Sequence, residues 1–367
     1  MLKEKLLETF KNLGGIEKYI NKGETILLKV NLVMRKKPEE AATTHPAFVR
    51  ALSEILVNYG CKVIIGDSPG GPFNELLLKS IYKTTGMEEA AKLSGASLNY
   101  STETLTAEYP EGKIIRKLTV AKFIMEADKI ISVSKLKTHS MTKMTGAVKN
   151  MFGIIPGTVK AEYHFSYPDV DAFSDCLLDI CGYASPILSF MDGITAMEGH
   201  GPTAGTPRKV GVILACENPY ELDLAASKII NSPINETPLI RHAIERGLCS
   251  KNTDEIKTVG DNLNYFVQKN FILPKTGSMH FLGDNPPKFL EGFVKKNLQP
   301  KPVFNSKLCV GCGDCALNCP AKIIEIKERL PHADLDKCIR CFCCQELCPM
   351  KAVSIKRPLI LKMLSKF

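Results

Sequence analysis

The chain has 367 residues and a mass of 40.4 kDa, which predicts two or three folded units because a typical domain has roughly 150 residues. Its composition, 44% apolar and 24% charged, excludes a largely disordered protein. The net charge of +9 does not by itself indicate a nucleic-acid-binding protein. More than half of this excess lies in residues 302–367, which hold 11 Lys and Arg against six Asp and Glu, and so it is not spread over the chain. The sequence also shows no groove-reading motif.

Neither a membrane-spanning helix nor a signal peptide is expected. No run of the sequence approaches the roughly 18 consecutive apolar residues that a membrane span needs. The first residues, MLKEKLLETFKNL, carry acids and bases throughout instead of an apolar core. We therefore expect a cytoplasmic protein with no integral membrane span.

Apolar residues recur at helical or strand spacing along residues 2–246, and turn residues separate these segments. The predicted helices are residues 2–20, 46–59, 75–84, 87–93, 143–152, 219–230 and 239–246. The predicted strands are residues 25–30, 62–65, 113–120, 129–133, 187–191 and 209–216. Because strands and helices alternate, we predict an α/β body whose mainly parallel sheet is covered by helices.

Three segments rich in glycine and polar residues follow predicted strands: residues 66–72, 135–157 and 192–205. Open α/β sheets bind ligands at the carboxyl ends of their strands, and the lysines of the second segment suit an anionic small-molecule ligand. Turn geometry alone would also explain the first segment, and a solvated basic face the second. The candidate residues of this crevice are Asp67, Lys135, Lys137, His139, Lys149, Asp192 and Glu198.

A change in composition marks a domain boundary near residue 285. Residues 283–302 are rich in Pro, Lys and Asn, which is typical of a linker. We therefore predict an α/β body at residues 1–285, a linker at residues 286–302, and a small C-terminal domain at residues 303–367.

The C-terminal segment concentrates nine of the 14 cysteines between positions 309 and 348. They form two runs 29 residues apart, CVGCGDCALNCP and CIRCFCCQELCP. A dense cysteine cluster in a cytosolic chain indicates metal binding instead of a disulfide framework. Zinc sites and structural disulfides are the alternatives, but two four-cysteine runs that each end in Cys-Pro are more typical of cubane clusters.

Each run matches C-x2-C-x2-C-x3-C-P and resembles the bacterial two-cluster 4Fe-4S ferredoxins, a small α+β domain. In this family the fourth cysteine of each run binds the other cluster. The resemblance therefore implies one 4Fe-4S cluster on Cys309, Cys312, Cys315 and Cys348, and a second on Cys338, Cys341, Cys344 and Cys319. Cys343 departs from the pattern, and we treat it as a residue that binds no cluster.

The body resembles the domain-of-unknown-function family 362, often fused to ferredoxin modules. The strings that carry the resemblance are TTHPAFVRAL, IIGDSPGG, SVSKLKTHSMTKMTGAVKNMFGIIPG, DGITAMEGHGPTAG and KVGVILACENPYELD. They extend over nearly all of residues 20–265. The family's biochemical role is poorly defined, so this resemblance implies an architecture more than a reaction.

A local segment is similar to the nickel-pincer lactate racemases, in which a lysine tethers an organonickel cofactor and a later histidine binds nickel. This similarity implies that Lys149 is the tether or an anion anchor, that His164 is a metal or cofactor ligand, and that His139 is a general base. The glycine pair that precedes this lysine in the racemases is Ala147-Val148 here. Aromatic residues near position 164 could instead cover a flavin.

Two hypotheses follow from the fusion of these segments. In the first, the protein is an iron-sulfur oxidoreductase whose ferredoxin domain passes single electrons to a ligand or cofactor in the α/β crevice. In the second, it is an electron carrier or docking module that only recognises a partner reductase. Both hypotheses require a redox partner protein as electron donor or acceptor.

Overall fold

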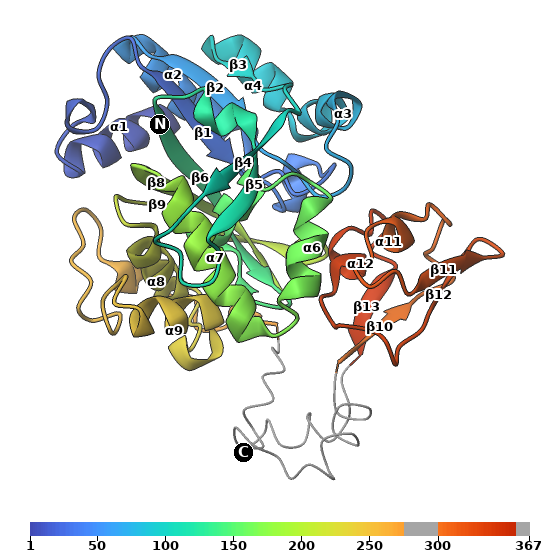
Figure 1. Cartoon of the computed structure of the whole chain (residues 1–367). Helices are drawn as coiled ribbons and strands as arrows, with labels where there is room; N and C mark the ends of the chain where they lie inside the picture. The colour runs from blue at the N-terminus through green and yellow to red at the C-terminus, as the bar shows by residue number, and fades with distance from the viewer. Residues whose placement is uncertain (275–299, 357–367) are drawn as a thin grey trace.

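The computed structural model describes residues 1–274 and 300–356, which form a large α/β body and a small C-terminal domain beside it (Figure 1). Most of the predicted linker, residues 286–302, lies outside the described residues. The small domain begins with β10 at Lys301, two residues before the predicted boundary. Among the described residues, no helix has both the length and the apolar character needed to cross a membrane.

A seven-stranded sheet forms the centre of the body. Its strand order is β3-β2-β1-β6-β8-β9, with β7 paired to β6 outside this path. The strands are β1 (Thr25–Val30), β2 (Lys62–Gly66), β3 (Ser97–Leu98), β6 (Lys129–His139), β7 (Lys143–Met144), β8 (Leu188–Glu198) and β9 (Thr206–Cys216). The pairings are parallel from β3 through β8, whereas β7 and β9 are antiparallel to their neighbours. The predicted mainly parallel α/β body is confirmed.

Helices cover both faces of this sheet because its inner strands are apolar on both sides. In β1, Ile26 and Leu28 pack toward α1 to α4, whereas Leu27 packs toward α7. The helices of the first face are α1 (Leu2–Asn12), α2 (Pro46–Tyr59), α3 (Glu75–Thr85) and α4 (Met87–Ser94). Those of the second face are α5 (Gly146–Asn150), α7 (Val170–Ala184), α8 (Pro219–Ile229) and α9 (Pro238–Glu245).

Several predicted boundaries differ from the observed elements. The strand predicted at residues 129–133 continues as β6 to His139, and the strand predicted at residues 187–191 continues as β8 to Glu198. The strand predicted at residues 113–120 forms part of a separate hairpin of β4 (Thr104–Glu108) and β5 (Lys117–Ala121). The helix predicted at residues 143–152 is divided into β7, α5 and a following 3-10 turn.

The small domain contains two short helices and two antiparallel strand pairs, as expected for a ferredoxin-type α+β domain. The strand pairs are β10 (Lys301–Phe304) with β13 (Val353–Lys356), and β11 (Ile324–Lys327) with β12 (Leu330–Ala333). The helices, α11 (Asp314–Leu317) and α12 (Cys343–Glu346), pack against each other and lie on the side of the domain nearest the body (Figure 1).

Candidate functional site at the carboxyl edge of the sheet

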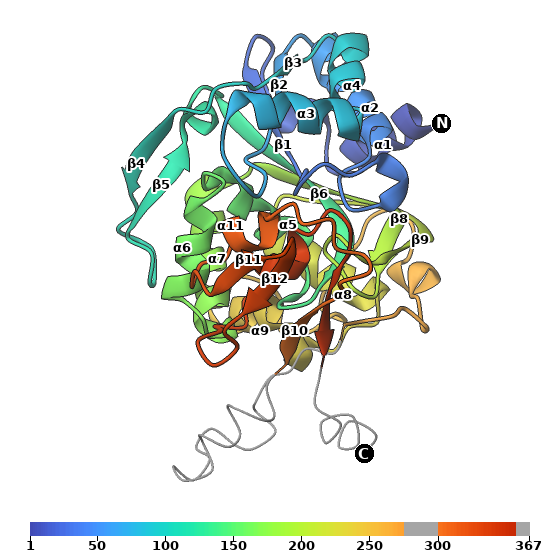
Figure 2. The same cartoon turned by 90° about the vertical axis from the view of Figure 1, so that its right-hand side faces the viewer.

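A pocket of about 90 Å³ lies where β1, β2 and β6 reach their carboxyl ends. This is the edge at which open parallel sheets bind ligands. The small domain forms one wall of the pocket, and Figure 2 shows this domain in front of α5. The residues that it contributes are Asn318, Cys343, Glu346 and Leu347. The candidate site is therefore shared by the body and the ferredoxin-type domain.

Hydrogen bonds at the last two residues of α12 hold the small domain against the body. Gln345 donates through Nε2 to the carbonyl of His200 at 3.2 Å, and the Thr203 hydroxyl donates to the carbonyl of Glu346 at 2.7 Å. Leu347 packs on Gly70 so closely that a Cβ atom at position 70 would lie 2.5 Å from Cδ2 of Leu347. The glycine of the predicted polar loop therefore allows the close approach of the small domain.

A buried ion pair fixes the end of β2. Lys29 Nζ lies 2.7 Å from Asp67 Oδ1, and both side chains are at most 5% exposed. The second carboxylate oxygen of Asp67 accepts the backbone N–H of Leu32 at 2.8 Å. Gly153 permits this arrangement, because a Cβ there would lie 2.1 Å from Asp67 Oδ1. The pair positions Asp67 at the wall of the pocket.

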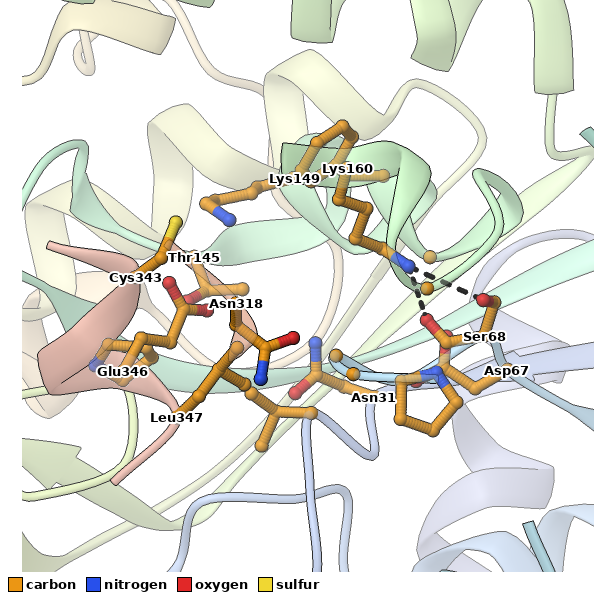
Figure 3. Close-up of a pocket in the computed structure, with 18 of the residues that line it drawn as sticks. Asn31, Asp67, Ser68, Thr145, Lys149, Lys160, Asn318, Cys343, Glu346 and Leu347 are labelled. Carbon is orange, nitrogen blue, oxygen red and sulfur yellow. Dashed lines mark hydrogen bonds between the residues drawn. The ribbon is translucent and has the colours of Figure 1, made fainter. Parts of the chain in front are cut away.

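Three lysines from three elements converge on the pocket. Lys137 comes from β6, Lys149 from α5, and Lys160 from α6 (Val159–Ser166). Lys160 donates to the carbonyl of Ser68 at 2.6 Å (Figure 3). It also donates to the carbonyl of Ile155 at 2.6 Å. Burial lowers the pKa of Lys137 to about 7 and that of Lys160 to about 7. Both side chains are therefore close to losing their charge at neutral pH.

His139 and Glu346 connect the body to the small domain. His139 Nδ1 accepts the backbone N–H groups of Met141 at 3.1 Å and Thr142 at 3.3 Å. The proton of the neutral imidazole is therefore assigned to Nε2, which lies 3.5 Å from Glu346 Oε2. Burial, together with the charge of Lys149, lowers the pKa of His139 to about 4. Burial alone would raise the pKa of Glu346. The charge of Lys149 and the hydrogen bond with His139 have a larger effect in the opposite direction, so this pKa lies below its usual range.

His164 lies on α6 in an aromatic environment. Its ring stacks on Phe173 with a centroid distance of 4.4 Å and meets Phe152 edge-on at 5.9 Å. Its Nδ1 is buried and has no hydrogen-bond partner among the described residues. Burial, together with the charge of Lys149, lowers the pKa of His164 to about 3, so the ring is neutral at pH 7.

Unpartnered polar atoms gather at this pocket. Within residues 1–274 and 300–356, Asn31 Oδ1, Thr145 Oγ1 and His164 Nδ1 are buried without a hydrogen bond and belong to residues that line the pocket. Buried polar groups in native proteins are nearly always paired. Three such atoms around one pocket indicate groups that are available to a bound ligand.

We expect acid to destabilise the fold through His164. Its folded-state pKa lies below the unfolded value of about 6.5, so only the unfolded chain takes up this proton as pH falls below 6.5. Lowering the pH from 7 to 5 should therefore reduce the free energy of unfolding by about 2 kcal/mol through this residue alone. Anaerobic urea unfolding of wild type and His164→Gln at both pH values measures this contribution. Equal losses in both proteins would contradict it.

The pocket brings together five of the eight candidate residues that the sequence suggests for the body: Asp67, Lys137, His139, Lys149 and His164. Lys135 and Asp192 instead form a buried ion pair at 2.7 Å outside the pocket. Glu198 pairs with Arg208 at 3.1 Å, also away from the pocket. A register shift between Lys135 and Lys137 in β6 separates these two lysines.

Sequence reasoning missed several residues of the pocket. Thr145 lies in the basic segment of residues 135–157 and Lys160 just beyond it, and membership of this polar stretch was the available signal. The contribution of Glu346 depends on how the small domain docks, and cysteine spacing carries no information about docking. Asn31 follows β1 directly, at the strand end where a ligand residue is expected.

The eight predicted cluster ligands surround two cavities in the small domain. One is lined by Cys309, Cys312, Cys315 and Cys348, and the other by Cys319, Cys338, Cys341 and Cys344. Each cavity therefore takes its fourth cysteine from the other run, as the ferredoxin resemblance implies. Cys343 lines the pocket instead of either cavity.

The cysteine arrangement suits a cubane better than a single ion. No cysteine of the described chain forms a disulfide. No three His, Cys, Asp or Glu side chains in that part of the chain come close enough together to hold one metal ion. Four thiols spaced around a cavity fit the larger 4Fe-4S cluster, for which soft thiolates are the usual ligands.

Comparisons with known proteins match both parts of the chain. A family model described as domain of unknown function (DUF362) matches residues 26–228, and a model described as 4Fe-4S dicluster domain matches residues 301–349. Both predicted resemblances, and with them an iron-sulfur domain, are thereby confirmed. A thylakoid-associated protein of Synechocystis sp. is 31% identical over 225 residues, which cover 59% of this chain and 66% of that protein, slightly less than two thirds.

Two solved structures are less similar to this chain. The lactate racemase apoprotein of Thermoanaerobacterium thermosaccharolyticum is 12% identical, with a TM-score of 0.36 over 57% of this chain and 49% of its own. A structural-genomics protein of Thermotoga maritima is 15% identical, with a TM-score of 0.36 over 65% of this chain and 59% of its own. At these values neither likeness bears on the function of this chain.

Proposed function

We propose that this chain, which belongs to the DUF362 family and contains a 4Fe-4S dicluster domain, is an oxidoreductase in which single electrons reach a small ligand held in the pocket. The observation that carries the proposal is the position of the pocket. Three of its lining residues, Asn318, Cys343 and Leu347, are the direct sequence neighbours of cluster ligands from both cysteine cavities. A ligand in the pocket would therefore lie close to both clusters.

The unpartnered polar atoms support an active site over a simple carrier. A domain that only docks a partner enzyme needs no buried and unsatisfied groups at the end of its sheet. Thr145, His164 and Asn31 supply such groups here. The carrier hypothesis explains the clusters but leaves these atoms without a role.

The residues of the pocket would bind the ligand and control its protons. The clusters, when bound, supply one-electron chemistry. Of the three lysines, Lys149 is the most available to a ligand, because it makes no hydrogen bond or ion pair with any described residue. His139 was expected to act as a general base, but its Nδ1 is occupied by two backbone N–H groups. With its proton on Nε2 and a pKa lowered to about 4, the neutral ring would act as a hydrogen-bond donor near Glu346.

The other cofactor and location expectations stay predictions. A pocket of about 90 Å³ is smaller than the roughly 300–1,000 Å³ of typical drug-sized ligand sites, which favours a small ligand over a flavin ring. A nickel cofactor bound by His164, which the racemase similarity implies, stays a prediction, and among the described residues no group of three possible metal ligands is found. The cytoplasmic location also stays a prediction.

Reoxidation of the reduced protein tests this function. Cluster-replete protein is reduced with dithionite under anaerobic conditions, freed of reductant, and mixed with 2-oxo acids, nitro compounds and nitrite while the cluster absorbance is followed. We expect at least one compound to reoxidise the clusters, and Lys149→Met to slow this step by about tenfold or more, since a charged hydrogen bond contributes roughly 1.5–3 kcal/mol. Lys83→Met, which removes an exposed lysine on α3, should not change the rate.

Oxidation by cytochrome c in the same proteins separates the two hypotheses. An oxidoreductase that uses the pocket should lose only its reaction with the small compound in Lys149→Met. If none of the compounds reacts while cytochrome c oxidises all variants at one rate, the carrier hypothesis is favoured and the pocket has no part in electron transfer.

A further inference from the structure

The three lysines of the pocket have no acidic partner in the described part of the chain. Lys137 donates to the carbonyl of Ala42 at 2.6 Å, and Lys160 also donates to backbone carbonyls. Lys149 lies over the ring of Phe152, with Nζ 5.4 Å from the centroid. None of the three ammonium groups therefore has its charge neutralised by direct contact.

When all three lysines are protonated, the carboxylates of the pocket leave two positive charges uncompensated. Asp67 is already neutralised by Lys29 at 2.7 Å. Glu346 offsets one of the three lysines, and its contact is with His139. The two histidines add no charge at pH 7, because burial lowers the pKa of His139 to about 4 and that of His164 to about 3.

Buried cations without a counter-ion lose protons instead of keeping their charge. Burial lowers the pKa of both Lys137 and Lys160 to about 7. The charged groups that act on Lys137 or on Lys160 are Glu346, Lys149, Asp67, Lys135 and Lys29. Only two of these are acids, and one of them is already paired. A bound anion would stabilise the charged form of both lysines.

We propose that the ligand of this pocket is a compact oxyanion with two negative charges, a phosphate group or a short dicarboxylate. The inference deepens the proposed function and rests on it in one respect: the dianionic group would be the part of the electron acceptor that the pocket holds. Two negative charges match the excess left by Lys137, Lys149 and Lys160. The Thr145 hydroxyl and the unpartnered His164 nitrogen supply polar contacts in the same pocket, and the pocket volume suits an ion of this size.

Binding to the oxidised protein tests the inference without any electron transfer. Calorimetric titration of the cluster-replete full chain uses inorganic phosphate, oxalate and acetate under anaerobic conditions. We expect phosphate or oxalate to bind at least about tenfold more tightly than acetate, and the tighter of the two identifies the source of the dianion. Titration at pH 8 in two buffers of different ionisation enthalpy should show net proton uptake, because Lys137 and Lys160 regain their protons.

Charge variants assign the binding to this pocket. Lys149→Met should weaken dianion binding by about tenfold or more, because one charge-assisted contact is lost. Lys149→Arg should retain most of the affinity, and the exposed control Lys83→Met should bind as wild type does. Equal affinity for acetate, no binding of either dianion, or wild-type binding by Lys149→Met would overturn the inference. Binding without later reoxidation of the reduced protein would contradict the proposed function alone.

Discussion

Replacing Cys348 by alanine should remove the same cluster as replacing Cys309, although the two residues belong to different cysteine runs. Both line one cavity, together with Cys312 and Cys315. A 4Fe-4S cluster needs four thiolates, so either single variant should lose about four of about eight irons. Iron and sulfide analysis of anaerobically purified protein, with EPR of the dithionite-reduced state, measures the loss.

Double variants make the crossed ligation testable. Cys309→Ala/Cys348→Ala should lose no more iron than either single variant, because one cluster is affected twice. Cys309→Ala/Cys338→Ala should lose both clusters, since these residues line different cavities. Cys343→Ala is the matched control, and it should retain all the iron because its side chain lies in the pocket. The crossed assignment is wrong if Cys338→Ala/Cys348→Ala retains one intact cluster.

Breaking the buried Lys29–Asp67 pair should cause a large loss of stability in the body. Lys29→Met leaves the carboxylate of Asp67 buried without a counter-ion, at a site where both side chains are at most 5% exposed. Removing one partner of a buried ion pair costs about 3–5 kcal/mol. Anaerobic urea unfolding of the full chain should show this loss.

Two further variants separate the charge effect from general damage. Lys29→Met/Asp67→Asn should recover most of the lost stability, because the amide is neutral and its oxygen can still accept the Leu32 N–H. Lys79→Met breaks an exposed pair with Glu75, which should cost less than about 1 kcal/mol. A loss for Lys29→Met as small as that for Lys79→Met would show that Asp67 does not depend on this lysine.

The sequence predicts a complete set of cluster ligands because their signal is local. Spacing of two and three residues determines which thiols can surround one cluster, and Cys-Pro marks the end of each run. The assignment of Cys343 away from the clusters also agrees with its position in the pocket. These features depend on short segments of chain and need no knowledge of tertiary contacts.

The ends of the strands were harder to predict, because the observed strands include charged residues that are buried. The sequence suggests that β6 ends before the basic segment, yet β6 extends to His139. Lys135 remains in the strand because Asp192 neutralises it, and Lys137 because the carbonyl of Ala42 accepts a hydrogen bond from its ammonium group. A single sequence does not show these partners, since Asp192 lies 57 residues away.

The wall formed by the small domain could not be predicted either. Glu346 and Leu347 were visible only as residues between cluster ligands. Their place in the pocket depends on contacts of α12 with residues near positions 70, 139 and 200 of the body. Such contacts follow from the complementary shapes of two folded units, which leave no periodic pattern in the sequence.

The midpoint potentials of the clusters test most directly whether pocket and clusters form one unit. Lys149 lines the pocket beside Glu346, which lies between the cluster ligands Cys344 and Cys348. Removing this positive charge should disfavour the added electron, so an EPR-monitored titration of Lys149→Met should give more negative potentials than wild type. Lys149→Arg and Lys83→Met should titrate as wild type does. Wild-type potentials in Lys149→Met would contradict the account, because the pocket would then be electrostatically separate from the clusters.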